Sequence, residues 1–312
     1  MPGLYAPDGG VNRLPKKWIA PVGGVNKELK ELYGVAGGAN RKVFTAGIAI
    51  GSLSVGDKVK FGKIYGNPII WTVAEKNHTG YPANSVTLAT SGIIKFLAYD
   101  ASEPTNPAGD RATYGNDRYD YSNIRQWLNK NSSAGNWYVA QHAYDNDPSG
   151  TSSVLNGYNS YTASQGFLYA FTVNEQNALL NTTVISKIFE SGAINLTDKI
   201  FLASCAELGI TSGTQEGTKL SLFNTSSYLV AKATSDAALN DQFGSASGSA
   251  YTWWTRSTYG AGNVRCITNS GGVADYGTPR NGNIGLRPAC NLSANALVSQ
   301  DLDTDGCHTF IN

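Results

Sequence analysis

The chain has 312 residues, a formal net charge of +1 and only 15% charged residues. This length can bury a substantial core in one large or two ordinary domains. The near-neutral charge gives no reason to expect nucleic acid or an anionic membrane surface as a partner, and no apolar run reaches the length of a membrane span. With 35 Gly and 17 Tyr, the composition is that of a loop-rich extracellular or virion protein rather than a metabolic enzyme.

The first 45 residues carry a short repeat. Gly-Gly-Val-Asn or Gly-Gly-Ala-Asn begins at Gly9, Gly23 and Gly37, and each copy continues to an aromatic residue. A fixed period indicates repeated supersecondary units, and one copy is too short to bury a core. We predict that residues 1–45 dock or oligomerise the chain, with a flexible basic leader as the alternative, and that residues 46–312 form the main domain. The amino-terminal MPGLYAPDGG lacks the basic and apolar regions of a secretory signal, so we do not expect secretion.

The main domain begins with strand patterns. Residues 58–65 alternate with period two, and a second strand over 68–73 follows the Gly66-Asn67 turn. Residues 86–89, 93–98 and 199–205 have the composition of further strands.

Two helices are predicted between these strands. Ser122 can cap a helix over 123–129, which places Trp127 on its apolar face. Thr172 and Glu175 have the spacing of a capping box, and the apolar stripe of this second helix runs on toward Val184. The predicted order of elements has strands first, helices in the middle and short strands last. This order predicts an α+β domain with mostly antiparallel pairing.

The segment 251–290 is the most informative part of the sequence. It contains no Lys, Glu, Gln or Met, and it is rich in Tyr, Asn, Ser, Gly and Arg. Such a composition is typical of a binding surface, because Tyr gives rigid contact area while Asn, Ser and Gly give adaptable hydrogen bonding. The predicted ligand-binding residues are Thr258, Tyr259, Asn263, Arg265, Thr268, Asn269, Asp275, Tyr276, Arg280, Asn281 and Asn283.

Other residues of the segment are predicted to be scaffold, together with Trp127. Trp253 and Trp254 alternate across a strand, so one ring faces the core and the other faces the opposite side, where it either packs or stacks on a ligand. Arg256 belongs to the same strand. Arg287 lies between Leu and Pro, which favours a guanidinium that satisfies buried carbonyls over one that binds an anion.

No pattern in the sequence indicates catalysis or a cofactor. His78, His142 and His308 lie outside any recognisable nucleophile motif, and no nucleotide-binding glycine motif occurs. We therefore expect no catalytic residue and no cofactor.

No metal site is expected either. The four cysteines lack zinc-site spacing, and free buried thiols are favoured over a bridge between Cys266 and Cys290 on neighbouring strands. Residues 301–306 match the start of an EF-hand loop, but Asn312 stands where the bidentate Glu is needed, so a hairpin turn is favoured. Asp145 and Asp147 also have the spacing of a turn.

Several segments taken in order resemble a family of uncharacterised phage and Gram-positive bacterial domains with a C-type-lectin-like fold. The resemblance covers most of residues 47–300, and it is carried by residues 56–62, 69–73, 121–129, 199–207, 253–257 and 285–289. The segment 251–290, which we call the closing segment, also resembles the corresponding segment of the variable proteins of diversity-generating retroelements. In those proteins, mutagenised AAC codons cannot encode Lys, Glu, Gln, Met or Trp, and residues 258–283 contain none of these.

The resemblance implies a phage virion protein with a lectin-like receptor-binding domain. It would bind a bacterial surface glycan or protein, and residues 1–45 would contact other virion proteins in what we expect to be a homo-oligomer. One alternative is a virion decoration protein without a ligand. Formylglycine-generating oxidases share the fold, but they need paired copper-binding cysteines, which makes an oxidase the less favoured alternative.

Overall fold

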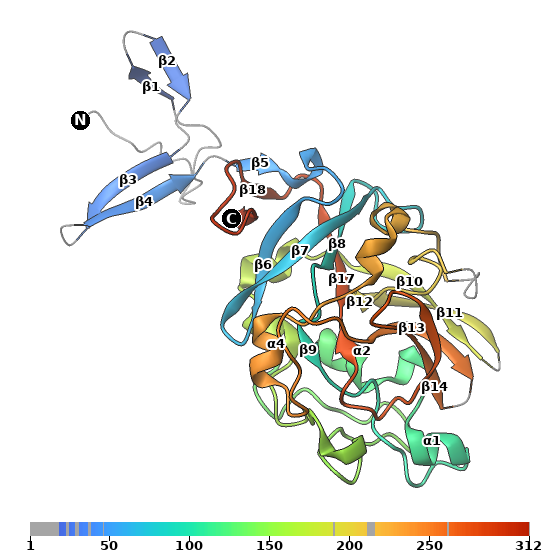
Figure 1. Ribbon diagram of the computed structural model, residues 1–312. Helices are drawn as coiled ribbons and strands as arrows, with labels where there is room; N and C mark the ends of the chain where they lie inside the picture. Colours follow the sequence, from blue (N-terminus) through green and yellow to red (C-terminus); the bar gives the residue numbers. More distant parts are fainter. Residues whose placement is uncertain are drawn as a thin grey trace.

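The computed structural model describes the backbone of residues 19–22, 25–28, 31–36 and 39–45. It describes residues 47–189, 191–210, 216–260 and 262–311 with their side chains. Strands dominate, and the described residues contain four short α-helices. This arrangement confirms the predicted α+β class (Figure 1).

Two hairpins precede the main domain. Strand β1 (Ile19–Val22) pairs antiparallel with β2 (Val25–Glu28), and β3 (Glu31–Ala36) pairs antiparallel with β4 (Ala39–Thr45). The first repeat and the glycine pairs of the second and third repeats lie outside the described residues. The docking or oligomerising role of this segment stays a prediction.

An eight-stranded sheet forms the larger part of the main domain. Its order is β12-β17-β8-β7-β6-β19-β18-β5. The strands in that order are Ile200–Leu202, Pro288–Ser293, Ser85–Thr90, Asn67–Lys76, Lys58–Ile64, His308–Ile311, Leu297–Ser299 and Gly47–Ala49. Because β5 pairs with β18 and β6 pairs with β19, the start and the end of the domain are hydrogen-bonded to each other (Figure 1).

A second, five-stranded sheet carries most of the closing segment. Its order is β15-β14-β13-β16-β9. The strands in that order are Val273–Gly277, Asn263–Ile267, Trp253–Gly260, Gly285–Leu286 and Lys95–Phe96. A separate hairpin of β10 (Thr182–Ile188) and β11 (Gly192–Asp198) lies beside it, and β10 contacts β13.

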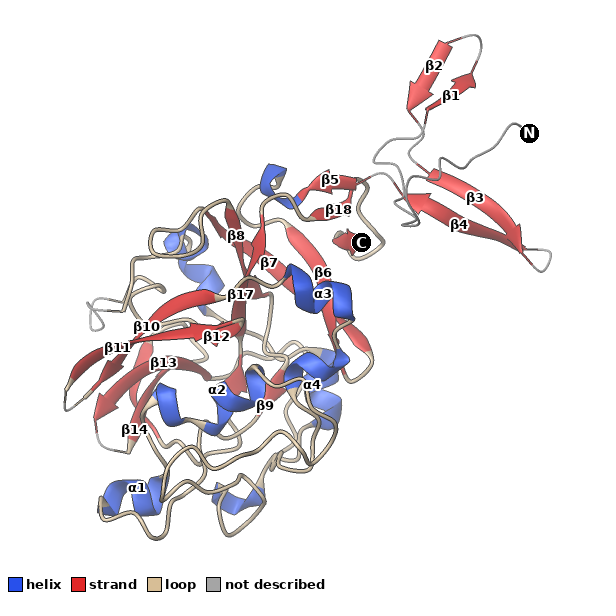
Figure 2. Ribbon diagram, turned by 180° about the vertical axis from the view of Figure 1, so that it is seen from behind, coloured by secondary structure: helices blue, strands red, loops and turns tan. Residues whose placement is uncertain are grey.

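Four six-residue helices surround the sheets: α1 (Gly109–Tyr114), α2 (Asn123–Leu128), α3 (Val173–Ala178) and α4 (Ser235–Asn240). Both predicted helix starts are confirmed, since Ser122 caps α2 and Thr172 and Glu175 form a capping box on α3. Glu175 also accepts a hydrogen bond from the Gly62 backbone N–H (2.9 Å), which holds α3 beside β6 (Figure 2).

Several predicted boundaries were wrong. The count of two helices missed α1 and α4. Helix α3 ends at Ala178, because the chain becomes extended at Leu179 and bridges to β17; Val184 therefore lies on β10. The strands expected over 93–98 and 199–205 are reduced to the short β9 and β12.

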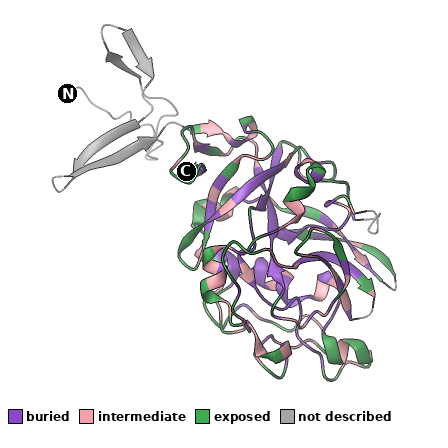
Figure 3. Ribbon diagram, in the orientation of Figure 1, coloured by how far each residue is buried: buried purple, intermediate pink, exposed green. Residues whose placement is uncertain are grey.

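The core is rich in tryptophan. Buried residues follow the central strands of the main domain (Figure 3). Trp71, Trp253 and Trp254 are each at most 1% exposed, and each indole N–H donates to a backbone carbonyl. Neither ring of the Trp253-Trp254 pair is therefore open to a ligand, because the strand that carries them is covered on both faces.

All four cysteines are free and buried, as favoured from the sequence. Cys266 and Cys290 are not on neighbouring strands: Cys266 lies on β14 of the five-stranded sheet, and Cys290 lies on β17 of the eight-stranded sheet. In the described part of the chain, no helix combines the length and the apolarity needed to cross a bilayer.

Candidate ligand-binding face

The predicted binding residues follow β13, β14, β15 and the loop to β16. Four of them are exposed and six are half-buried. The exposed ones are Tyr259, Asn269, Tyr276 and Asn283, and the half-buried ones are Asn263, Arg265, Thr268, Asp275, Arg280 and Asn281. Thus ten of the eleven reach the surface at least in part.

Thr258 does not belong to this surface. It is 2% exposed, and its hydroxyl donates to the Asp117 carboxylate (2.6 Å). Asp117 also accepts from the Gly262 backbone N–H (3.3 Å) and the Arg111 guanidinium (3.0 Å). Thr258 therefore fixes the end of β13 and cannot contact a ligand, which corrects its assignment.

One group of predicted residues gathers on one face of the strands. The Arg265 guanidinium donates to Asp275 (2.9 Å) and lies 5.4 Å from the centre of the Tyr259 ring. Tyr259 is 47% exposed. The cation on the ring and its carboxylate partner hold a polar aromatic patch in one conformation. We call Tyr259, Arg265 and Asp275 the tyrosine–arginine patch.

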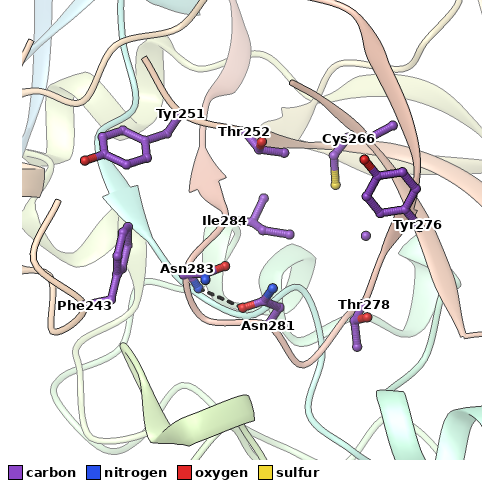
Figure 4. A pocket seen from close by; sticks show the side chains of 11 residues that line it. Phe243, Tyr251, Thr252, Cys266, Tyr276, Thr278, Asn281, Asn283 and Ile284 are labelled. Carbon is purple, nitrogen blue, oxygen red and sulfur yellow. Dashed lines mark hydrogen bonds between the residues drawn. The ribbon is translucent and has the colours of Figure 1, made fainter. Parts of the chain in front are cut away.

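A pocket of about 410 Å³ gathers the other group. Figure 4 shows Phe243 and Tyr251 on one side and Tyr276 on the other, with Asn281, Asn283 and Ile284 between them. The remaining lining residues are Thr252, Cys266, Ala274, Gly277 and Thr278. We call this the Tyr276 pocket.

Two glycines are tightly packed at the Tyr276 pocket: Gly277 lines it, and Gly282 lies in the loop between the lining residues Asn281 and Asn283. A Cβ on Gly277 would lie 2.4 Å from Cys266 Sγ and 2.6 Å from a backbone oxygen of β14. A Cβ on Gly282 would lie 1.8 Å from the Tyr158 carbonyl oxygen. At both positions the close packing leaves no room for a side chain.

The loop over 278–284 is tied to distant parts of the chain. Asn159 Nδ2 donates to the Gly282 carbonyl (2.8 Å), and the Tyr99 backbone N–H donates to the Pro279 carbonyl (2.8 Å). The Arg280 backbone is bonded on both sides, to the Tyr114 carbonyl and the Leu155 N–H. The pocket is therefore preformed, which lowers the entropy lost on binding.

The two groups lie on opposite faces of the sheet. Side chains alternate along a strand, so Asp275 points to the tyrosine–arginine patch and its neighbour Tyr276 points into the pocket. Thr268 and Asn269 lie at the β14–β15 turn, where Thr268 Oγ1 accepts from the Gly272 N–H (3.0 Å). The sequence predicted one continuous binding face. In the structure the predicted residues are instead divided among the tyrosine–arginine patch, the Tyr276 pocket and the β14–β15 turn.

The scaffold residues are buried with their polar atoms bonded. Arg287 is 3% exposed, and its guanidinium donates to the carbonyls of Thr90 (2.9 Å) and Tyr228. Trp127 is also buried and donates to the Gln165 carbonyl (2.8 Å). Arg256 is fully buried and paired with Glu207. Arg256 and Arg287 are thus used within the chain and are not available to an anionic ligand.

Sequence reasoning missed part of the pocket. Phe243 comes from the loop after α4, outside the closing segment, and its ring lies 5.9 Å from that of Tyr251 in an edge arrangement. Tyr251 is the first residue of the segment 251–290 but is not among the predicted binding residues. No short-range pattern links Phe243 to the segment, so only the fold brings it there.

A cluster of possible metal ligands also went unpredicted. Ligand atoms of Glu103, His142 and Asp145 lie within 4.8 Å of one another. Burial raises the pKa of the Glu103 and Asp145 carboxyls. Such a set could hold a divalent cation, but the carboxylates already accept hydrogen bonds, from Asn116 Nδ2 (3.1 Å) to Glu103 and from the Gln141 N–H (2.7 Å) to Asp145. Both carboxylates are therefore used in hydrogen bonds within the chain, and we assign the cluster no ligand.

The segment that resembles an EF-hand is a turn. Asp303 accepts from the backbone N–H groups of Asp305 (2.9 Å) and Cys307 (3.0 Å), and both aspartates pair with Lys60. Its carboxylates are thus used within the chain.

Comparison with known proteins places the sequence in one family. Residues 84–294 match the family described as Domain of unknown function (DUF6273). Neither the curated proteins nor the solved structures include a significant match to the chain. The matched region contains the tyrosine–arginine patch, the Tyr276 pocket and the buried arginines.

Proposed function

The chain belongs to this family of domains of unknown function, and we propose that it is a receptor-binding protein of a phage particle that recognises a bacterial surface glycan through the Tyr276 pocket. The observation that carries the proposal is the composition of that pocket. Aromatic rings, hydroxyls and side-chain amides line a preformed hollow of about 410 Å³.

This chemistry suits a sugar. The Tyr276 ring is 77% exposed and offers a flat apolar surface to the C–H face of a pyranose ring. The side-chain amides of Asn281 and Asn283 supply both donors and acceptors for sugar hydroxyls. A mostly apolar hollow with a few placed polar groups is the usual form of a small-ligand site.

The tyrosine–arginine patch serves as a second contact in this proposal. Because it lies on the other face of the same sheet, contact with both sites requires a large ligand, such as a polymeric glycan or a surface protein. Tyrosine and arginine are enriched among the residues that dominate binding energy at interfaces.

We propose further that the domain has the C-type-lectin-like fold. The segments that carry this resemblance contribute to buried elements of both sheets: residues 69–73 to β7, 253–257 to β13 and 285–289 to β16 and β17. A resemblance carried by core elements supports a shared fold more strongly than one carried by surface loops.

The two alternative functions, an oxidase and a decoration protein, make different demands on the structure. An oxidase of the formylglycine-generating type needs two cysteines on one copper ion, whereas Cys266 and Cys290 belong to different sheets and both are fully buried. A decoration protein without a ligand needs no preformed pocket in the closing segment. Binding accounts for the pocket, so we favour it over both.

The test is a glycan-binding measurement. Purified protein is applied to an array of bacterial surface glycans, and the glycans that bind are titrated in solution with wild type and with Tyr276→Ala. We expect selective binding by the wild type that the variant loses. Absence of binding by the wild type across the array, or equal binding by the variant, would refute the proposed site.

A further inference from the structure

A second pocket lies outside the closing segment. It has a volume of about 260 Å³ and lies between the β6–β7 turn, β9, α2 and residues 164–170. Ile64, Trp127 and Phe167 form apolar walls, while Tyr65 and Lys95 contribute polar groups. None of its lining residues belongs to 251–290, so an inference about it does not rest on the proposed function.

Lys95 is a cation without an acidic partner. Its Nζ donates to the Tyr65 hydroxyl (2.8 Å) and lies 6.0 Å from the centre of the Trp127 ring. Among the described residues, no carboxylate forms an ion pair with it. Burial against apolar walls, with no opposing charge, lowers the pKa of Lys95 to about 8. Lys95 is half-buried, and an ammonium that loses part of its water without gaining an anion is destabilised, so an anionic ligand would find an unneutralised cation here.

Tyr65 is held in an unfavourable backbone conformation. It occupies the first position of the two-residue turn between β6 and β7 with φ of 52°, followed by Gly66 with φ of 86°. This hairpin turn favours Asn-Gly or Gly-Gly, and a bulky residue there costs roughly 1 kcal/mol. The geometry of the turn gives no reason for a tyrosine at position 65. The contact between the Tyr65 hydroxyl and Lys95 does give one. Strained residues of this kind concentrate at functional sites.

We propose that this pocket binds a single six-membered ring that carries one carboxylate, such as a hexuronic acid or an aromatic acid. The carboxylate pairs with Lys95. Tyr65 accepts the Lys95 hydrogen bond and therefore keeps its own hydrogen to donate to the second carboxylate oxygen. The ring packs on the walls formed by Trp127 and Phe167.

Size and charge favour this class over larger or more highly charged ligands. A volume of about 260 Å³ suits one ring rather than an oligosaccharide. A phosphate dianion usually needs several donors or an arginine. Here Lys95 faces the pocket, and the other lysine that lines it, Lys63, is exposed at the rim.

The test uses calorimetric titration of the full-length protein with glucuronate and with benzoate, which separate a sugar source from an aromatic one. Glucose and benzyl alcohol are the uncharged controls. We expect at least one of the acids to bind in the millimolar range or tighter and neither control to bind. No binding by either acid at about 10 mM, or equal binding of the controls, would overturn the proposal.

Two variants assign the binding to these residues. Lys95→Met keeps the stem and removes the charge, and we expect about a tenfold loss of affinity. Tyr65→Phe keeps the ring and removes the hydroxyl, with a smaller loss expected. Lys58→Met, an exposed lysine on β6, is the matched control and should bind as the wild type does. Unchanged affinity in Tyr65→Phe, together with unchanged affinity in a folded Lys95→Met, would contradict the assignment. If Lys95→Met does not fold, Tyr65→Phe decides alone.

A pH series gives an independent readout. Affinity should fall as the pH rises through about 8, because Lys95 loses its proton. The charged and titratable groups around it are Tyr65 and Lys63, with Asp236 and Asp241 acting on Tyr65. Burial raises the pKa of Tyr65 to about 12, so its phenol stays protonated throughout. Affinity that does not change between pH 6.5 and about 9.5 would argue against an ammonium–carboxylate contact.

Discussion

Arg256 and Glu207 form a fully buried bidentate ion pair. Arg256 Nη1 lies 2.7 Å from Glu207 Oε2, and Nη2 lies 2.5 Å from Oε1. The same guanidinium donates to the carbonyls of Leu202 (2.6 Å), Ile185 (2.9 Å) and Glu216 (3.1 Å). The pair therefore anchors β13 to β10 and to the residues around β12. The strand that leads into the binding face is fixed at its centre.

Breaking this pair should strongly destabilise the fold. Removing one partner leaves a buried charge uncompensated, and we expect Arg256→Met or Glu207→Gln to lower the free energy of unfolding by about 3–5 kcal/mol. Arg256→Lys should also be destabilising, because a single ammonium cannot make the same set of planar contacts. Urea unfolding measures each effect, and losses below about 1 kcal/mol would show that the pair does not anchor β13.

Changes in the Tyr276 pocket should affect binding and leave stability intact. Tyr276→Ala and Asn283→Ala remove exposed side chains, so we expect at least about a tenfold loss of glycan affinity and less than about 1 kcal/mol change in unfolding free energy. Tyr169→Ala, at a tyrosine that is 49% exposed elsewhere, is the control. An equal loss in the control would indicate a non-specific effect.

Sequence variation at this locus should follow burial. If the segment is diversified, substitutions across a phage population should concentrate at exposed positions such as Tyr259, Asn269 and Tyr276. They should spare Gly277 and Gly282, where a Cβ meets other atoms. Deep sequencing of the locus checks this pattern. Drift spread evenly along the gene would favour the decoration protein.

The thiols should be unreactive until the protein unfolds. Burial raises the pKa of Cys205, Cys266, Cys290 and Cys307 above the ordinary thiol range, and the thiolate is the reactive form. In a thiol titration at pH 8 we expect little reaction of the native chain and four thiols per chain after unfolding without reductant. Fast labelling of native Cys266 or Cys290 would instead favour the oxidase.

His78 should make stability depend on pH in the mildly acidic range. It is 5% exposed, and burial lowers its pKa below the ordinary value of about 6.5. As the pH falls through 6.5 the unfolded chain binds a proton that the folded state does not, so stability is lost in that window.

The His78→Gln variant isolates this contribution. We expect its unfolding free energy to fall less steeply than that of the wild type between pH 7 and about 5.5. Chemical denaturation at several pH values measures the two slopes, and identical slopes would show that His78 does not contribute.

Local contacts were readable in the sequence. The Ser122 cap and the Thr172–Glu175 capping box join residues three positions apart, so a short pattern is sufficient to predict them. The aromatic, amide-rich composition of residues 251–290 likewise marked the segment that carries the exposed residues Tyr259, Asn269 and Tyr276, although its strands are mostly buried.

The tertiary structure alone decided what those residues do together. Arg256 meets Glu207 across 49 positions, and Lys95 meets Tyr65 across 30. It buried Thr258, brought Phe243 to the Tyr276 pocket and placed Asp275 and Tyr276 on opposite faces. The physical reason is the range of the interactions: caps and turns are satisfied within a few residues, whereas burial, ion pairs and pockets depend on which strands pack together.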